Sequence, residues 1–191
     1  MGLHVENTDA SFGAFVTGVD LSKDLSSDLV AELRVLWLKH KVLAFPEQEM
    51  NDRDLERFSL YFGEFGEDPF LGHIEGHENI AAIQRNADET TPIFAENLHS
   101  DWSFLDVPPA GTCLFGIIIP PSGGNTLFAD QVAAYENLPD NLRGQADSLV
   151  AIHSAKKGYA PDGKFGAADK AKGRSMNIIT TISPGPIFVR K

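Results

Sequence analysis

The chain has 191 residues, of which 42% are hydrophobic and 23% charged, a composition typical of a globular domain that buries its own apolar core. Its net charge of −11 argues against nucleic acid as the main partner, because phosphate binding needs a basic surface. The single cysteine, Cys113, excludes an internal disulfide framework, and no apolar run approaches the roughly 18 residues that a membrane span needs. We therefore expect one soluble, cytoplasmic domain over residues 1–191, with no membrane partner.

The N-terminal third alternates between strand and helix patterns. Residues 15–21 are predicted as a short strand, and a helix is expected to begin at Ser26 or Ser27, because either hydroxyl can accept a hydrogen bond from a first-turn N–H. A strand over residues 42–45 follows, and Asn51 is predicted to cap a second helix. Apolar residues recur at helical spacing in both helices: Leu29, Leu33, Leu36 and Trp37 in the first, and Leu55, Phe58 and Phe62 in the second.

The next part of the chain is polar and rich in glycine. Residues 63–78 and 85–97 are expected to be loops, with a strand over residues 79–84 between them. The first loop contains a group that is either a second metal cluster or an ordinary solvated segment: His73, Glu75 and His77. The flanking glycines argue against a regular helix there.

An apolar stretch begins at residue 111. Residues 111–119 are predicted as a strand buried on at least one face, and Cys113 within it as a small buried hydrophobe. The segment PPSGGN over residues 120–125 indicates a turn, and residues 126–129 are expected to form a short strand.

Two helices are expected over residues 131–138 and 141–149, after which residues 150–153 could return to the sheet. His153 is expected to pack or hydrogen-bond near that sheet. From Lys156 onward eight basic residues accompany only two acidic ones, so this segment is either an anion-binding tail or a solvated, mobile loop. The whole pattern predicts an α+β protein whose core is a β-sandwich or barrel.

His99 and Asp101 are the residues best suited to chemistry. In an extended segment, side chains two residues apart point the same way, so an imidazole nitrogen and a carboxylate oxygen could bind one ion. Two histidines and one carboxylate, with open positions opposite, are the ligands of non-haem iron(II) oxygenases. A His-x-Asp pair alone is common by chance, so its surroundings matter.

Those surroundings are specific. The segment from His99 reads HSDWSFLDVPPAG, and it is followed by PPSGGNTLFA from Pro120 and AAYE from Ala133. Upstream, GVDLS, KVLAF and FGEFG occur in that order. Together these segments resemble the iron(II)/2-oxoglutarate-dependent dioxygenases of the taurine dioxygenase (TauD/TfdA) family over about residues 12–178, whereas residues 179–191 form a divergent tail.

The resemblance implies a fold and a set of roles. The fold would be an incomplete double-stranded β-helix, a jelly-roll or cupin-like core, with N-terminal and flanking helices. His99 and Asp101 would be two iron ligands, and Thr126 would hydrogen-bond a carboxylate of 2-oxoglutarate. Iron(II), 2-oxoglutarate as co-substrate and O₂ would together hydroxylate a small organic substrate. Trp102 and Phe104 either line the substrate pocket or belong to the core.

The chain also departs from the family. A second iron-binding histidine and an arginine for 2-oxoglutarate are implied far downstream, yet no histidine follows His153, and Arg190 lies in the wrong context. We therefore expect impaired catalysis in this chain. Taurine is an unexpected substrate, because the family's taurine-binding positions correspond here to Asp68, Leu71 and Ala95.

Two functions remain open at this point. One is a dioxygenase acting on a small molecule. The other is a non-catalytic binding or assembly protein on the same scaffold, with a second copy of the chain covering an open sheet edge. The missing histidine favours the second, and the retained His99, Asp101 and Thr126 favour the first.

Overall fold

The computed structural model describes residues 2–66, 72–88, 90, 98–154 and 188–190. Among these residues, none of the helices has the length and apolar character needed to cross a membrane. The predicted basic tail from Lys156 and the positions Asp68, Leu71 and Ala95 lie outside them, apart from the short strand at residues 188–190.

The described strands form a five-stranded sheet and a two-stranded hairpin. The larger sheet has the order β1-β2-β3-β7-β6, with β1 and β2 antiparallel and the other neighbours parallel. Its strands are β1 (His4–Asn7), β2 (Ala14–Thr17), β3 (Leu43–Ala44), β6 (Thr112–Cys113) and β7 (Phe188–Arg190). The architecture is α+β, as predicted. The small sheets do not trace a jelly roll, so that part of the fold stays a prediction.

Both N-terminal helices begin where the sequence predicts. Helix α1 (Ser27–His40) is capped by Ser26, whose hydroxyl accepts from the N–H of Leu29. Helix α2 (Asp52–Leu60) is capped by Asn51 in a reciprocal arrangement with Asp54. Each cap satisfies donors that the first helical turn leaves free.

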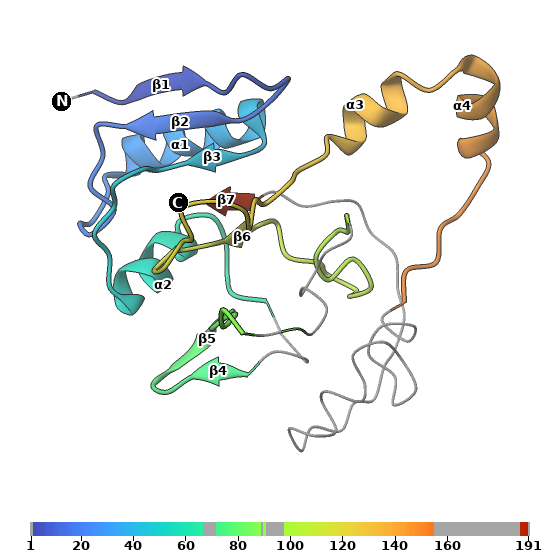
Figure 1. The fold of residues 1–191 in the computed structure, drawn as a ribbon. Coiled ribbons are helices and arrows are strands. Elements are labelled where there is room, and N and C mark those ends of the chain that lie inside the picture. The colour runs from blue at the N-terminus through green and yellow to red at the C-terminus, as the bar shows by residue number, and fades with distance from the viewer. Residues whose placement is uncertain (1, 67–71, 89, 91–97, 155–187, 191) are drawn as a thin grey trace.

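The core lies between α1, α2 and the strands β2 and β3, whereas the residues of β1 are exposed (Figure 1). Phe58 contacts the rings of Phe45 and Phe62 edge-on, at centroid distances of 5.5 and 5.2 Å, and Trp37 contacts Phe62 at 5.3 Å. The buried apolar residues are Ala14, Val16, Leu21, Leu33, Trp37, Leu43, Phe45 and Phe58. Such interlocking rings stabilise a core beyond the area they bury.

The region predicted as a loop over residues 63–78 contains a hairpin instead. Strands β4 (His73–Ile74) and β5 (His77–Ala81) pair antiparallel around Glu75 and Gly76. Gly76 adopts a φ of +79°, which glycine reaches without steric cost. The loop prediction was therefore wrong for residues 73–74 and 77–78, whereas residues 75–76 form the turn between the strands.

Of the apolar strand predicted over residues 111–119, only the two residues of β6 form a strand in the structure. Its C-terminal half is exposed, with Ile117 77% and Ile118 90% accessible. Within the described part of the chain β7 is the only strand beside β6, and a strand needs hydrogen-bonded neighbours on which to extend. The strands expected at residues 126–129 and 150–153 are likewise absent from the described residues.

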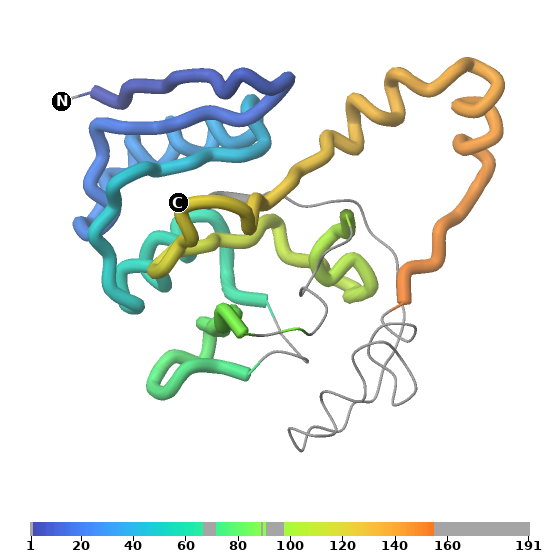
Figure 2. The backbone as a smooth tube through the Cα atoms, in the orientation of Figure 1, coloured from blue at the N-terminus to red at the C-terminus, as the bar shows by residue number. Residues whose placement is uncertain are grey.

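From residue 131 onward the chain extends away from the sheet. Figure 2 shows it running outward through helices α3 (Gln131–Glu136) and α4 (Asp140–Ala146). Both helices were predicted, with longer bounds. An ion pair of 3.1 Å between Lys41 Nζ and Asp130 Oδ2 links the start of α3 to the end of α1.

Candidate metal centre

The His99–Asp101 pair lies where a segment without regular structure enters a tight turn. Residues 98–100 have no regular structure, and residues 101–104 form the turn, closed by a hydrogen bond from the Leu105 N–H to the Trp102 carbonyl at 2.9 Å. Trp102 has a φ of +47°, an uncommon backbone conformation for a bulky residue.

The two predicted ligands do meet. His99 Nε2 and Asp101 Oδ1 lie 3.0 Å apart, with the histidine about half exposed and the aspartate more covered. At this separation the ring can donate a hydrogen bond to the carboxylate, or both atoms can bind one ion. Two donors at bonds of about 2.1 Å and at right angles around an ion lie about 3.0 Å apart. The pair therefore fits two adjacent positions of an octahedral metal such as iron(II).

The described residues supply these two donors and not a third. No group of three or more His, Cys, Asp or Glu able to hold a metal occurs among them. This also argues against the alternative cluster of His73, Glu75 and His77. Instead, His77 Nδ1 lies 2.9 Å from Glu56 Oε2 and joins the hairpin to α2.

A threonine holds the other oxygen of the carboxylate. Thr112 Oγ1, on β6, donates to Asp101 Oδ2 at 2.9 Å. The sequence places Thr112 in an apolar strand and gives it no role. The sequence does show a hydroxyl group within an otherwise apolar strand. It does not show that this hydroxyl bonds to Asp101, because the two residues are 11 positions apart and no local spacing links them.

Two further contacts hold the turn in place. Gln131 Nε2, on α3, donates to Ser100 Oγ at 2.7 Å, and His153 Nδ1 lies 2.7 Å from Ser103 Oγ. His153 is thus hydrogen-bonded, as predicted, although it does not lie in a strand. Ser100, between the two predicted ligands, is thus tied to the first residue of α3, and Ser103, after them, is tied to the segment that follows α4.

The Asp130 carboxyl at the start of α3 is kept in its ionised form by its neighbours. The backbone N–H of Ala133, and then the Lys41 ammonium, hold the pKa of the Asp130 carboxyl below its ordinary value. Asp130 caps α3 by accepting from the N–H groups of Val132 and Ala133. Because this carboxyl stays ionised, it keeps its bonds to Lys41 and to the helix.

The remaining predicted site residues have different surroundings. Thr126 is exposed on a segment without regular structure, and no hydrogen bond joins it to His99 or Asp101 among the described residues. Its role toward 2-oxoglutarate stays a prediction. Trp102 and Phe104 are half-buried and pack edge-on with centroids 5.7 Å apart, which suits a pocket wall and a small satellite core equally.

The comparisons with known proteins agree with the motif. The family model of the taurine catabolism dioxygenases, TauD, TfdA family, matches residues 4–181. The chain belongs to this family. Several of its curated relatives carry alpha-ketoglutarate, a synonym of 2-oxoglutarate, in their names.

Two curated relatives and one solved structure illustrate the similarity. An alkylsulfatase of Acinetobacter baylyi is 34% identical over 82% of this chain and 49% of its own length. An alpha-ketoglutarate-dependent sulfate ester dioxygenase of Pseudomonas putida is 31% identical over 83% and 52%. The crystal structure of a taurine dioxygenase from Burkholderia xenovorans, 31% identical, superposes with a TM-score of 0.64 over 79% of this chain and 53% of the other. The chain therefore spans about half the length of these relatives.

Proposed function

We propose that this chain carries part of the metal centre of an iron(II)/2-oxoglutarate-dependent dioxygenase that hydroxylates a small organic substrate. The observation that supports it most directly is the 3.0 Å approach of His99 Nε2 and Asp101 Oδ1 in a chain of this family. Bound iron(II) would supply activation of O₂, with 2-oxoglutarate oxidised to succinate and CO₂ as one oxygen atom enters the substrate C–H bond.

The residues of this chain would bind and orient. His99 would hold the ion through neutral Nε2, and Asp101 through ionised Oδ1. Thr126 would donate its hydroxyl hydrogen to a 2-oxoglutarate carboxylate, after movement of its exposed segment. Trp102 and Phe104 would form an apolar wall that keeps water from the substrate.

Sulfate esters are the substrate class to examine first. Two relatives that match more than four-fifths of this chain carry names for sulfate ester chemistry. An alkyl sulfate combines an anionic head with an apolar chain, and the aromatic pair beside Asp101 suits the apolar part.

Turnover tests the proposal. With iron(II), ascorbate, O₂, 2-oxoglutarate and an alkyl sulfate, we expect slow formation of succinate, because the described residues supply two donors where the family's site has three. An Asp101→Ala variant should form at least about tenfold less, since it removes a direct ligand. Equal succinate formation by the Asp101→Ala variant and the wild-type chain would contradict the proposal.

A non-catalytic binding protein is the second candidate. It is favoured by the lack of a third donor among the described residues. This candidate predicts binding of metal and 2-oxoglutarate with no succinate formed in the same assay. The expectation that a second copy covers an open sheet edge also stays a prediction, and light scattering of the purified chain checks it.

A further inference from the structure

Asp101 has two carboxylate oxygens with different surroundings. Oδ1 faces His99 Nε2 at 3.0 Å, whereas Oδ2 accepts the hydroxyl of Thr112 at 2.9 Å. A hydrogen bond from a neutral hydroxyl uses a lone pair of Oδ2 that a metal would otherwise take. The two oxygens therefore have separate tasks, one toward the ion and one toward the protein.

The position of Thr112 follows from the core. Its neighbour Cys113 packs against the apolar core, and burial raises the pKa of the Cys113 thiol, so this residue behaves as a small hydrophobe. Adjacent residues of a strand point to opposite faces. With Cys113 anchored on the core side, the Thr112 hydroxyl is directed to the other side, where the Asp101 turn lies.

We propose that Thr112 is a positioning residue that holds the Asp101 carboxylate for one-oxygen binding of the metal. This inference rests on the proposed function. With Oδ2 held by the hydroxyl, Asp101 binds through Oδ1 alone and occupies a single coordination position. Two-oxygen binding would occupy a further position, which 2-oxoglutarate and O₂ need. Thr112 also fixes the direction of Oδ1 toward His99 Nε2, so that the two donors are already in place before the ion arrives.

The test compares Mn²⁺ binding by the full chain and four variants, using the electron paramagnetic resonance signal of free Mn²⁺. Thr112→Val removes the hydroxyl but keeps the β-branched shape that suits a strand. Thr112→Ser restores the hydroxyl. Thr17→Val makes the same change at an exposed residue of β2, and His99→Ala removes a direct ligand. Far-UV circular dichroism checks that every variant is folded.

We expect Thr112→Val to weaken Mn²⁺ binding by about 10- to 100-fold, the usual effect of losing a partner of a metal ligand. Thr112→Ser should retain most of the affinity, and Thr17→Val should match the wild-type chain. Rescue by serine separates positioning by the hydroxyl from a packing role of the threonine methyl group.

The outcomes distinguish the two proposals. If His99→Ala loses affinity but Thr112→Val does not, the metal centre stands and the role of Thr112 is overturned. Equal loss in Thr112→Val and Thr112→Ser also overturns it, because the hydroxyl would not be the cause. A wild-type chain that binds Mn²⁺ no better than His99→Ala overturns the metal centre, and the role of Thr112 with it.

Discussion

At the scale of single residues, the candidate site depends on a few polar contacts between segments that are distant in sequence. Thr112 reaches Asp101, Gln131 reaches Ser100, and His153 reaches Ser103. Each contact joins the turn after His99 to another part of the chain. Besides the backbone hydrogen bond within the turn, these contacts tie the turn to the rest of the chain.

The ion pair between Lys41 and Asp130 yields a prediction at this scale. Replacing Lys41 by Met keeps the apolar stem but removes the charge that faces Asp130, 3.1 Å away. We expect faster hydrogen exchange of the α3 amides, because the helix loses its tie to the end of α1. The urea midpoint of the whole chain should change little, since a partly exposed ion pair adds little to global stability.

Hydrogen exchange read by mass spectrometry checks this prediction on peptides from α3. Lys39→Met provides the control, because Lys39 is an exposed residue on the same helix turn. Unchanged exchange of α3 in the Lys41→Met variant would show that the ion pair does not restrain the helix.

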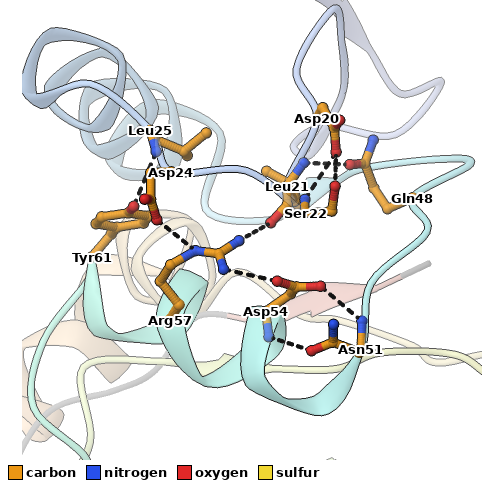
Figure 3. A network of polar contacts seen from close by, with 10 residues as sticks. All are labelled: Asp20, Leu21, Ser22, Asp24, Leu25, Gln48, Asn51, Asp54, Arg57 and Tyr61. Carbon is orange, nitrogen blue, oxygen red and sulfur yellow. Dashed lines mark hydrogen bonds and ion pairs between the residues drawn. The ribbon is translucent and has the colours of Figure 1, made fainter.

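At the scale of elements, α2 and the segment before α1 form one polar network (Figure 3). Arg57 donates to Asp54 Oδ1 at 2.8 Å and to the Leu21 carbonyl at 3.0 Å, and it pairs with Asp24 at 3.2 Å. The Leu25 N–H donates to the Tyr61 hydroxyl at 3.0 Å. Through these bonds α2 satisfies backbone groups of a loop that has no secondary structure.

This network predicts an acid-sensitive stability. The N–H of Asn51, and then the Arg57 side chain, lower the pKa of the Asp54 carboxyl. The unfolded chain therefore takes up this proton at a higher pH than the folded chain does. Stability from Asp54 is present above its unfolded pKa of about 4 and is lost as pH falls below it.

Urea unfolding at pH 7, 4.5 and 3 measures the effect. We expect the wild-type midpoint to fall between pH 4.5 and 3. An Asp54→Asn variant should start from a lower midpoint at pH 7 and fall less, whereas the exposed Asp9→Asn variant should follow the wild-type chain. Equal acid sensitivity in Asp54→Asn and wild type would rule out this carboxyl as the cause.

The same elements show what sequence can predict. The caps of α1 and α2 and their apolar faces depend on residues within one or two turns, so Asn51, Leu33 and Phe58 were correctly assigned. The first cap was narrowed to Ser26 or Ser27, and the structure shows that it is Ser26. Strands depend on partners that are distant in the chain. Strand β1 was not predicted, the hairpin of β4 and β5 was predicted as mostly loop, and residues 111–119 as one long strand.

The candidate site likewise contains one feature that local sequence predicts and several contacts that it does not. The spacing of His99 and Asp101 is local, and the structure brings their donor atoms together. The contacts of Thr112, Gln131 and His153 span 11, 31 and 50 residues, and no local pattern indicates them. The sequence therefore predicted the pair of side chains that the structure brings together, whose role as metal ligands stays a prediction, and it did not indicate the residues that hydrogen-bond to this segment.

At the scale of the whole molecule, the described chain has a well-packed N-terminal body and a more open part that carries the two proposed metal ligands, His99 and Asp101. The apolar core lies within residues 14–58. Exposed apolar residues occur C-terminal to His99 and Asp101, among them Ile117, Ile118, Leu127, Val150 and Ile152. The chain spans about half the length of its curated relatives, so the activity of the whole protein is a proposal that rests on the family and on this one pair of donors.

Anaerobic titration of iron(II) into the purified chain with 2-oxoglutarate tests the metal centre most directly. We expect a weak visible charge-transfer band from 2-oxoglutarate chelated to iron. The band should disappear in His99→Ala and persist in His4→Ala, which removes a histidine on β1, in the N-terminal body. A wild-type chain without the band, or a band that survives in His99→Ala, would contradict the assignment of His99 and Asp101 as ligands of a working metal centre.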